Sequence, residues 1–171
     1  TYTLTYTATD ASGNVGTATK TVNVVDTTAP VFTSSATFSV AENQTVIGIV
    51  TATDLSGSTL FSIASDEIEI TTDGVLSFVL VPDYETKSSY TATVTASDGT
   101  NSNTQNITVN VTDVNEAPAF TSSATFSAAE NQTAIGTVTA TDADGDSVTF
   151  TVSGSELAIT SAGVLTFKAA P

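Results

Sequence analysis

Tyr90-Thr91-Ala92-Thr93-Val94-Thr95-Ala96-Ser97-Asp98 is the stretch that decides the fold class of this chain. Apolar and aromatic residues alternate with threonine along it, which is the two-residue period of a β-strand with one buried face. Ile107, Val109 and Val111 continue the alternation in the next segment. Turn signals such as Asp98-Gly99 separate these short runs, and no stretch carries a useful 3.6-residue apolar period. The pattern therefore predicts an all-β chain.

The same segments occur more than once in the chain. Residues 90–98 align with 2–10, and residues 108–113 align with 21–26. Four further segments return about 88 positions downstream, as expected of tandem modules. They are 31–39 repeated as 119–127, 41–45 as 129–133, 48–54 as 136–142, and 74–78 as 163–167.

We therefore expect tandem modules of about seven strands each, folded as Greek-key β-sandwiches of the immunoglobulin-like type. Residues 1–29 would be the C-terminal strands of a preceding module, 30–117 a complete module, and 118–171 the N-terminal part of a further one. Two explanations of the partial modules stay open. Either the sequence is a window on a longer array, or partial modules of neighbouring chains complete each other, since unpaired strands leave open sheet edges.

The composition excludes most catalytic chemistry. Among 171 residues there is no Cys and no His, and three Lys plus Arg stand against eighteen Asp plus Glu, for a net charge of −15. The basic residues are Lys20, Lys87 and Lys168, so Arg is absent too. The usual catalytic triads and zinc sites need His or Cys. Binding to nucleic acid or to anionic membranes needs basic patches. We therefore expect no enzyme, no nucleic-acid partner and no membrane insertion.

The acidic residues lie in predicted loops and linkers, while the centres of the strands are nearly free of charge. In a sandwich, those around the linker after residue 113 would converge on one end of a module and the facing end of the next. Carboxylates a few ångströms apart repel strongly unless a counter-charge is present. Calcium supplies one, since it accepts about six to eight oxygen ligands in irregular geometry. The candidate ligands at this junction are Glu42, Asp83, Glu85, Asp113, Asn115, Glu116, Asp142 and Asp144.

On these motifs the chain resembles the cadherin repeat, over the whole of 31–117 and most of the matched part of 118–171. Five segments carry the resemblance, each matching a ligand motif or the linker of that family. They are Glu42 within AEN, Asp83-Tyr84-Glu85, Ser97-Asp98-Gly99, the linker Asp113-Val114-Asn115-Glu116-Ala117-Pro118, and Asp142-Ala143-Asp144. The linker departs from the family pattern at Glu116, which replaces an Asp, and at Ala117, which replaces an Asn and weakens the third ion position.

The resemblance implies three Ca²⁺ positions at this junction. The outermost ion would be held by Glu42, Asp83, Glu85 and Glu116. The middle one would be held by Glu42, Glu85, Asp113, Asp144 and the Val114 carbonyl, and the third by Asn115, Asp142 and Asp144.

The earlier linker, Asp26-Thr27-Thr28-Ala29-Pro30, is shorter and has no equivalent of Asn115-Glu116. The module that follows it offers Asp54 and Asp98 as ligands, with Ser56 in place of the second Asp of the DxD motif. We expect at most one ion there. The ending DTTAP resembles that of bacterial immunoglobulin-like modules, so the first fragment is expected to belong to that sister family.

These observations predict a calcium-rigidified structural repeat of a large extracellular adhesin or filament on a bacterial surface, which acts as a stiff spacer between the cell and a tip. It would be located at the cell surface or secreted, and its partners would be adjacent modules of the same chain or of identical chains. One alternative is an adhesion module that binds carbohydrate or a surface protein. Another is a self-assembling filament subunit in which residues 1–29 complete the module begun by 118–171 of a neighbour.

Overall fold

The structure, a computed structural model, describes residues 1–55 and 57–171. All regular elements in this part of the chain are β-strands, so the prediction of an all-β fold is confirmed. No helix in it is long and apolar enough to cross a bilayer. The chain divides into two compact units, Thr1–Pro82 with Ser89–Asn110, and Asp83–Ser88 with Val111–Pro171. The module boundaries expected at 29/30 and 117/118 stay predictions.

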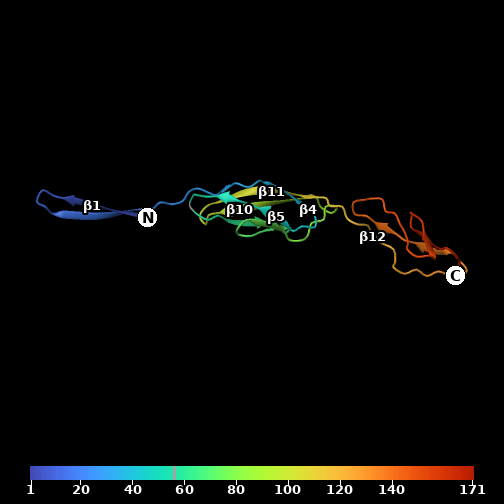
Figure 1. The fold of residues 1–171 in the computed structure, drawn as a ribbon. Coiled ribbons are helices and arrows are strands. Elements are labelled where there is room, and N and C mark those ends of the chain that lie inside the picture. Colours follow the sequence, from blue (N-terminus) through green and yellow to red (C-terminus); the bar gives the residue numbers. More distant parts are fainter. Residues whose placement is uncertain (56) are drawn as a thin grey trace. The chain divides into compact units, whose positions relative to one another are not determined.

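The first unit contains a β-sandwich with a four-stranded and a three-stranded sheet (Figure 1). The four-stranded sheet has the order β4 (Thr37–Ala41), β11 (Ser102–Thr112), β10 (Ser89–Ser97) and β7 (Leu60–Ala64). The three-stranded sheet has the order β5 (Val46–Ile49), β9 (Val75–Phe78) and β8 (Ile68–Ile70). A short pair, β3 (Val31–Phe32) with β6 (Ala52–Thr53), completes the sandwich.

The core of this sandwich follows the alternation that the sequence predicts. On β10 the side chains of Val94 and Ala96 are buried, and on β11 those of Ile107 and Val109 are buried. The opposite sheet contributes the buried side chains Ile47, Ile68, Leu76 and Phe78. The Tyr90 ring packs edge-on against the Phe78 ring with 4.8 Å between ring centroids. Strands β10 and β11 therefore close one side of the core, and the turn between them carries Asp98.

The N-terminal segment is a hairpin of β1 (Tyr2–Thr9) and β2 (Val15–Val22), with every residue of both strands exposed. Its register pairs Tyr2 with Val22, as the register of β10 and β11 pairs Tyr90 with Val109. The turn is held by Asp10, whose carboxylate accepts hydrogen bonds from the Asn14 side chain at 2.7 Å and the Asn14 backbone N–H at 2.8 Å. The Asn14 side chain is the main reason that the pKa of Asp10 lies below its usual value.

The strands of the second unit pair with one another as β3, β5, β6, β8 and β9 do in the first unit. Strand β12 (Ala119–Phe120) pairs with β14 (Ala140–Thr141), as β3 pairs with β6. Strands β13 (Ala134–Thr137), β16 (Val164–Phe167) and β15 (Leu157–Ile159) form the equivalent of the three-stranded sheet. Both copies have a register shift in the first strand of that sheet. The repeated sequence therefore folds into repeated structure.

Candidate metal centres

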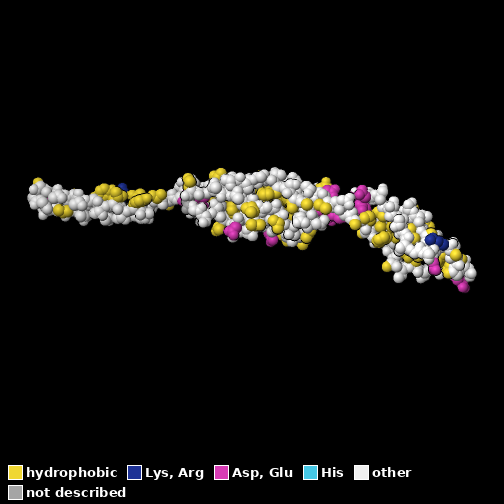
Figure 2. Space-filling model, in the orientation of Figure 1, with side chains coloured by type: hydrophobic (Ala, Val, Ile, Leu, Met, Phe, Trp, Pro, Cys, Tyr) yellow, Lys and Arg dark blue, Asp and Glu magenta, His cyan; other side chains and the backbone are white. Residues whose placement is uncertain are grey.

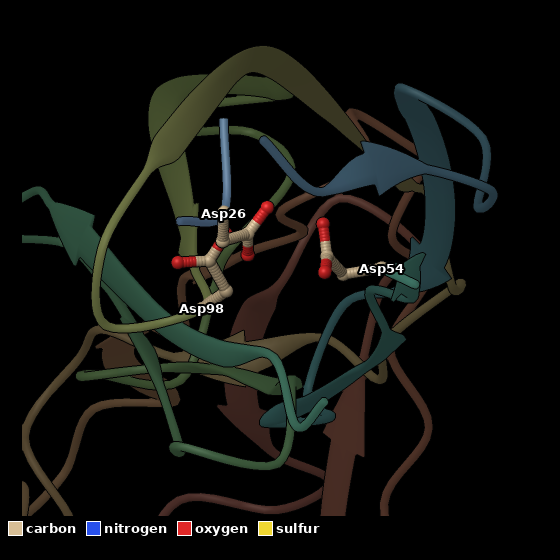
Figure 3. Close-up of side chains that lie close together, drawn as sticks. All are labelled: Asp26, Asp54 and Asp98. Atoms are coloured by element: carbon tan, nitrogen blue, oxygen red, sulfur yellow. The ribbon is translucent and has the colours of Figure 1, made fainter. Parts of the chain in front are cut away.

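Three aspartates in the first unit come together at one end of the sandwich. Asp26 lies in the segment between β2 and β3, Asp54 directly follows β6, and Asp98 lies in the turn between β10 and β11. One carboxylate oxygen from each residue lies within 4.8 Å of the others. Figure 3 shows the three side chains around a common space. Two loops of the sandwich and the segment before it therefore contribute to one acidic group, which we call the Asp26 group.

The two carboxylate oxygens of Asp98 have different surroundings. Oδ1 accepts hydrogen bonds from the backbone N–H groups of Thr100 at 2.6 Å and Asn101 at 2.7 Å, which fixes the turn. Oδ2 is buried and has no hydrogen-bond partner. A buried carboxylate oxygen without a partner is unfavourable. A bound cation would supply the missing interaction, so the donor chemistry of this group fits a hard metal ion.

The segment before β3 is also tied to the sandwich by groups that the sequence did not single out. Asn103 donates a hydrogen bond from Nδ2 to the Pro30 carbonyl at 3.1 Å. The Asp26 carboxylate accepts hydrogen bonds from the backbone N–H and the hydroxyl of Thr28, at 3.1 and 3.0 Å. An isolated Asn in a strand carries no sequence signal, since its role depends on which loop lies beside it.

A second acidic group lies within the second unit and consists of Glu85, Asp113 and Asp144. One carboxylate oxygen from each also lies within 4.8 Å of the others. Asp113 follows β11 directly, and Asp144 lies in the loop after β14. Asp144 Oδ2 accepts a hydrogen bond from the Glu116 backbone N–H at 2.9 Å, which positions the linker against this loop. We call these three residues the Asp113 group.

The other predicted ligands of the second unit lie in loops and in the linker after β11. Asp83 accepts hydrogen bonds from the Thr86 backbone N–H at 2.9 Å and the Thr86 hydroxyl at 3.0 Å, one on each oxygen. Asp142 accepts one from the Asp146 backbone N–H at 3.1 Å. Asn115 donates from Nδ2 to the Glu116 carbonyl at 3.0 Å. Val114, expected to ligate through its carbonyl, has an exposed side chain.

Glu42 belongs to the first unit and directly follows β4. Its side chain is only 2% exposed, and no other charged residue in the described part of the chain is buried to this degree. The ion position that would join Glu42 to Glu85 and Glu116 draws on residues of both units, so it stays a prediction from the sequence. Ser56, expected to replace the second Asp of the DxD motif, lies outside the described residues.

The two acidic groups resemble cation sites more than catalytic ones. Each consists of oxygen ligands alone, and the chain carries only three basic residues against eighteen acidic ones. Oxygen-only ligand sets suit hard ions such as Ca²⁺. Mg²⁺ demands near-ideal octahedral geometry and is usually bound by only one or two carboxylates. The ligand chemistry of the two acidic groups therefore suits Ca²⁺ better than Mg²⁺.

Comparisons with known proteins agree with the architecture. No protein-family model matches the chain. The mouse protein Cadherin EGF LAG seven-pass G-type receptor 1 is 43% identical over 76 residues, which are 42% of this chain and only 2% of that protein.

Solved structures match over most of the chain. Mouse cadherin-23 EC22-24 matches with a TM-score of 0.52 and 22% identity, over 99% of this chain and 63% of that one. Drosophila N-cadherin EC1-4 matches with a TM-score of 0.56 and 24% identity, over 82% of this chain and 40% of that one. The chain thus spans less than two thirds of either. At these identities the likeness concerns the fold, and we conclude that the chain has the fold of cadherin β-sandwich modules.

Proposed function

We propose that this chain is a calcium-rigidified structural repeat of an extracellular adhesion protein or surface filament. The observation that supports this most strongly is the Asp26 group. Three carboxylates from separate segments share one space, and the buried Asp98 Oδ2 has no hydrogen-bond partner. Calcium bound there would neutralise the repulsion and join the segment before β3 to the sandwich.

The position of the ligands explains how binding would change stiffness. Asp26 belongs to the connection that follows the hairpin β1–β2, whereas Asp54 and Asp98 belong to loops of the sandwich. Without an ion, mutual repulsion drives Asp26 away from the other two. With an ion, all three coordinate the same centre, and the connection loses its freedom to bend. The Asp113 group would act in the same way on the segment after β11.

The proposed extracellular location follows from the weak calcium affinity that is typical of extracellular modules. Extracellular calcium modules typically bind with dissociation constants of about 10⁻⁴ to 10⁻³ M, a range that requires the calcium levels found outside cells. The named relatives of this fold are cadherins, which is consistent with an adhesion-type repeat. The bacterial origin and the role as a spacer to a tip are part of the same proposal.

In the central sandwich, a structural role is favoured over a carbohydrate-binding one by where the phenylalanine rings lie. Phe61 and Phe78 are buried in the first unit. Phe32 packs against Phe61 with 6.4 Å between ring centroids. These rings fill the core, so they do not form an exposed platform for sugar stacking.

Calcium-dependent stiffening can be measured by distance spectroscopy, because the chain contains no cysteine. Spin labels would be attached to the double variant T7C/S62C, which labels β1 and β7. We expect a broad distribution of distances in a chelator and a narrow one in saturating calcium. A matched variant that also carries Asp98→Ala should stay broad in both. Equal widths with and without calcium in T7C/S62C would contradict the proposal.

A further inference from the structure

Two of the chain's three Asp-Gly dipeptides, Asp73-Gly74 and Asp98-Gly99, lie in the central sandwich, which is the sandwich of the first unit. An aspartate before glycine can modify itself, because glycine has no side chain to shield its backbone nitrogen from the neighbouring carboxyl carbon. Attack by that nitrogen gives a cyclic succinimide, and hydrolysis of the succinimide gives aspartate or isoaspartate. Acidic side chains lie at the surface of the central sandwich in several places (Figure 2), so exposure of a carboxylate alone does not identify a reactive one.

The turn at Asp73-Gly74 is held by backbone contacts. Gly74 is buried, its N–H donates to the Thr71 carbonyl at 2.9 Å, and its carbonyl accepts from the Val50 N–H at 2.8 Å. A Cβ on Gly74 would overlap the Val50 carbonyl oxygen. Attack by the Gly74 nitrogen requires its peptide group to rotate, and the rotation would break these hydrogen bonds and press the chain against Val50. The fold therefore protects Asp73 from modification.

The turn at Asp98-Gly99 lacks these restraints. Gly99 is exposed, and a Cβ there would meet no atom within 4 Å. Its N–H donates to the Ser97 hydroxyl at 3.1 Å, an exposed bond that water can replace. The Gly99 peptide group can therefore rotate toward the Asp98 carboxyl group at little cost.

The carboxyl group of Asp98 is folded toward the peptide groups that follow it. Oδ1 accepts hydrogen bonds from the backbone N–H groups of Thr100 at 2.6 Å and Asn101 at 2.7 Å. Attack on Cγ places negative charge on this oxygen, and two donors already aimed at it stabilise that charge as an oxyanion hole does. Oδ2 has no hydrogen-bond partner in the described part of the chain, so no such bond retains the oxygen that must leave.

We propose that Asp98-Gly99 is a self-modification site, at which Asp98 converts to isoaspartate when the Asp26 group holds no calcium. The bond between Gly99 N and Asp98 Cγ forms, and the bond between Cγ and Oδ2 breaks. Oδ2 leaves as water with the proton of the Gly99 N–H and one proton from solvent. A second water then opens the succinimide at the Asp98 backbone carbonyl carbon, giving its OH to that carbon and its proton to Gly99 N. The chain now runs through Cβ and Cγ of residue 98.

Calcium would suppress this reaction, and this half of the proposal rests on the proposed function. One oxygen of Asp98 lies within 4.8 Å of oxygens of Asp26 and Asp54, around the common space in Figure 3. An Oδ2 that coordinates an ion is not free to leave as water, and coordination fixes the carboxylate against the approach of Gly99 N. After isomerisation the carboxylate is attached directly to Cα, so the ligand set of the Asp26 group is lost. The modification would thus record the time that the chain spends without calcium.

Incubation of the full 171-residue chain in heavy-oxygen water, in a chelator and in saturating calcium, tests the proposal. Each succinimide that opens takes up one oxygen atom from the solvent, and electron-transfer fragmentation distinguishes isoaspartate from aspartate. Digestion in ordinary water after lysine and glutamate places Asp73 in the peptide 70–85 and Asp98 in the peptide 88–116. In the chelator, uptake at Asp98 should exceed uptake at Asp73 by roughly tenfold or more, the factor that one lost hydrogen bond imposes on a rate. Calcium at a hundredfold excess over its dissociation constant should slow uptake at Asp98 by up to about a hundredfold, because only the unbound chain reacts.

Matched variants separate the geometry of the turn from the effect of the ion. Asp98→Asn and Asp73→Asn follow the same route with ammonia as the leaving group. In a chelator, Asp98→Asn should lose its amide roughly tenfold or more faster than Asp73→Asn, for the same reason as above. In calcium, Asp54→Asn should lose most of the protection of Asp98, whereas Asp66→Asn, which removes an exposed acid outside the Asp26 group, should keep it.

The contradicting outcomes differ for the two halves of the proposal. Equal uptake at Asp98 and Asp73 in the chelator, or uptake at neither, would overturn the self-modification site. Equal uptake at Asp98 in calcium and in the chelator would overturn its control by calcium if melting curves of the same samples show that calcium binds. If those curves show no calcium binding, the proposed function fails instead, and the comparison of Asp98 with Asp73 in the chelator still decides the self-modification site.

Discussion

Replacing Gly74 with valine is expected to destabilise the sandwich of the first unit strongly. Gly74 has a φ of +90°, a backbone conformation that strongly disfavours a β-branched residue. A Cβ at this position would also overlap the Val50 carbonyl oxygen and come within 3.2 Å of the Phe61 ring. The Gly74 carbonyl accepts a hydrogen bond from the Val50 backbone N–H at 2.8 Å, so the two segments cannot separate without losing it. We expect a loss of roughly 3 kcal/mol or more, from backbone strain and overpacking together.

Gly99→Ala is the matched control for this prediction. Gly99 has a similar φ of +95°, but a Cβ there would meet no atom within 4 Å. Its loss should be limited to the backbone term of about 1–2 kcal/mol. Chemical denaturation in a chelator, followed by circular dichroism, would measure both variants without interference from calcium. Comparable stability of Gly74→Val and Gly99→Ala would show that the close approach to Val50 is not a constraint.

The second large effect is expected at Asp54, where a substitution should change the melting temperature in opposite directions with and without calcium. In a chelator, Asp54→Asn should raise the melting temperature, because the variant removes one of three mutually repelling carboxylates within 4.8 Å. Each such repulsion is on the order of 1 kcal/mol at a partly exposed site. In saturating calcium the same variant should be less stable than the unsubstituted chain, because a neutral amide is a weaker ligand. Calcium at a hundredfold excess over its dissociation constant contributes about 2.7 kcal/mol, and that contribution would be reduced.

Asp66→Asn is the control for the sign change, since Asp66 is an exposed acid outside both acidic groups. It removes the same charge, and its effect should be small and the same with and without calcium. Melting curves of the three proteins in both buffers would decide the matter. An effect of Asp54→Asn with the same sign in both buffers would mean that Asp54 does not share an ion with its neighbours.

The strands of this chain could be predicted from its sequence because their signal is local. The alternation in residues 90–98 and at Ile107, Val109 and Val111 corresponds to β10 and β11, with the apolar side chains of these strands mostly turned to the core. The internal repeats placed the equivalent strands of the second unit without further information. A period-two pattern identifies a strand and its buried face because successive side chains point to opposite faces of the sheet.

The arrangement of the site could be predicted only in part. The resemblance to the cadherin repeat pointed to Asp26, Asp54 and Asp98 as ligands of at most one ion. It could not show that Asp98 uses one oxygen for its turn and leaves the other buried without a partner. Nor could it show that Thr86 bonds both oxygens of Asp83. These details depend on the path of each turn, which the spacing of acids does not determine.

Thermal unfolding of this chain in calcium, in magnesium and in a chelator tests the central claim most directly. If calcium binds the acidic groups of the folded chain, calcium should raise the melting temperature by several degrees, since about 1 kcal/mol shifts a small domain by roughly 4–8 °C. Magnesium at the same concentration should have little effect, and the variants Asp98→Ala and Asp113→Ala should each lose part of the calcium response. Identical melting curves in calcium and in the chelator would contradict the account.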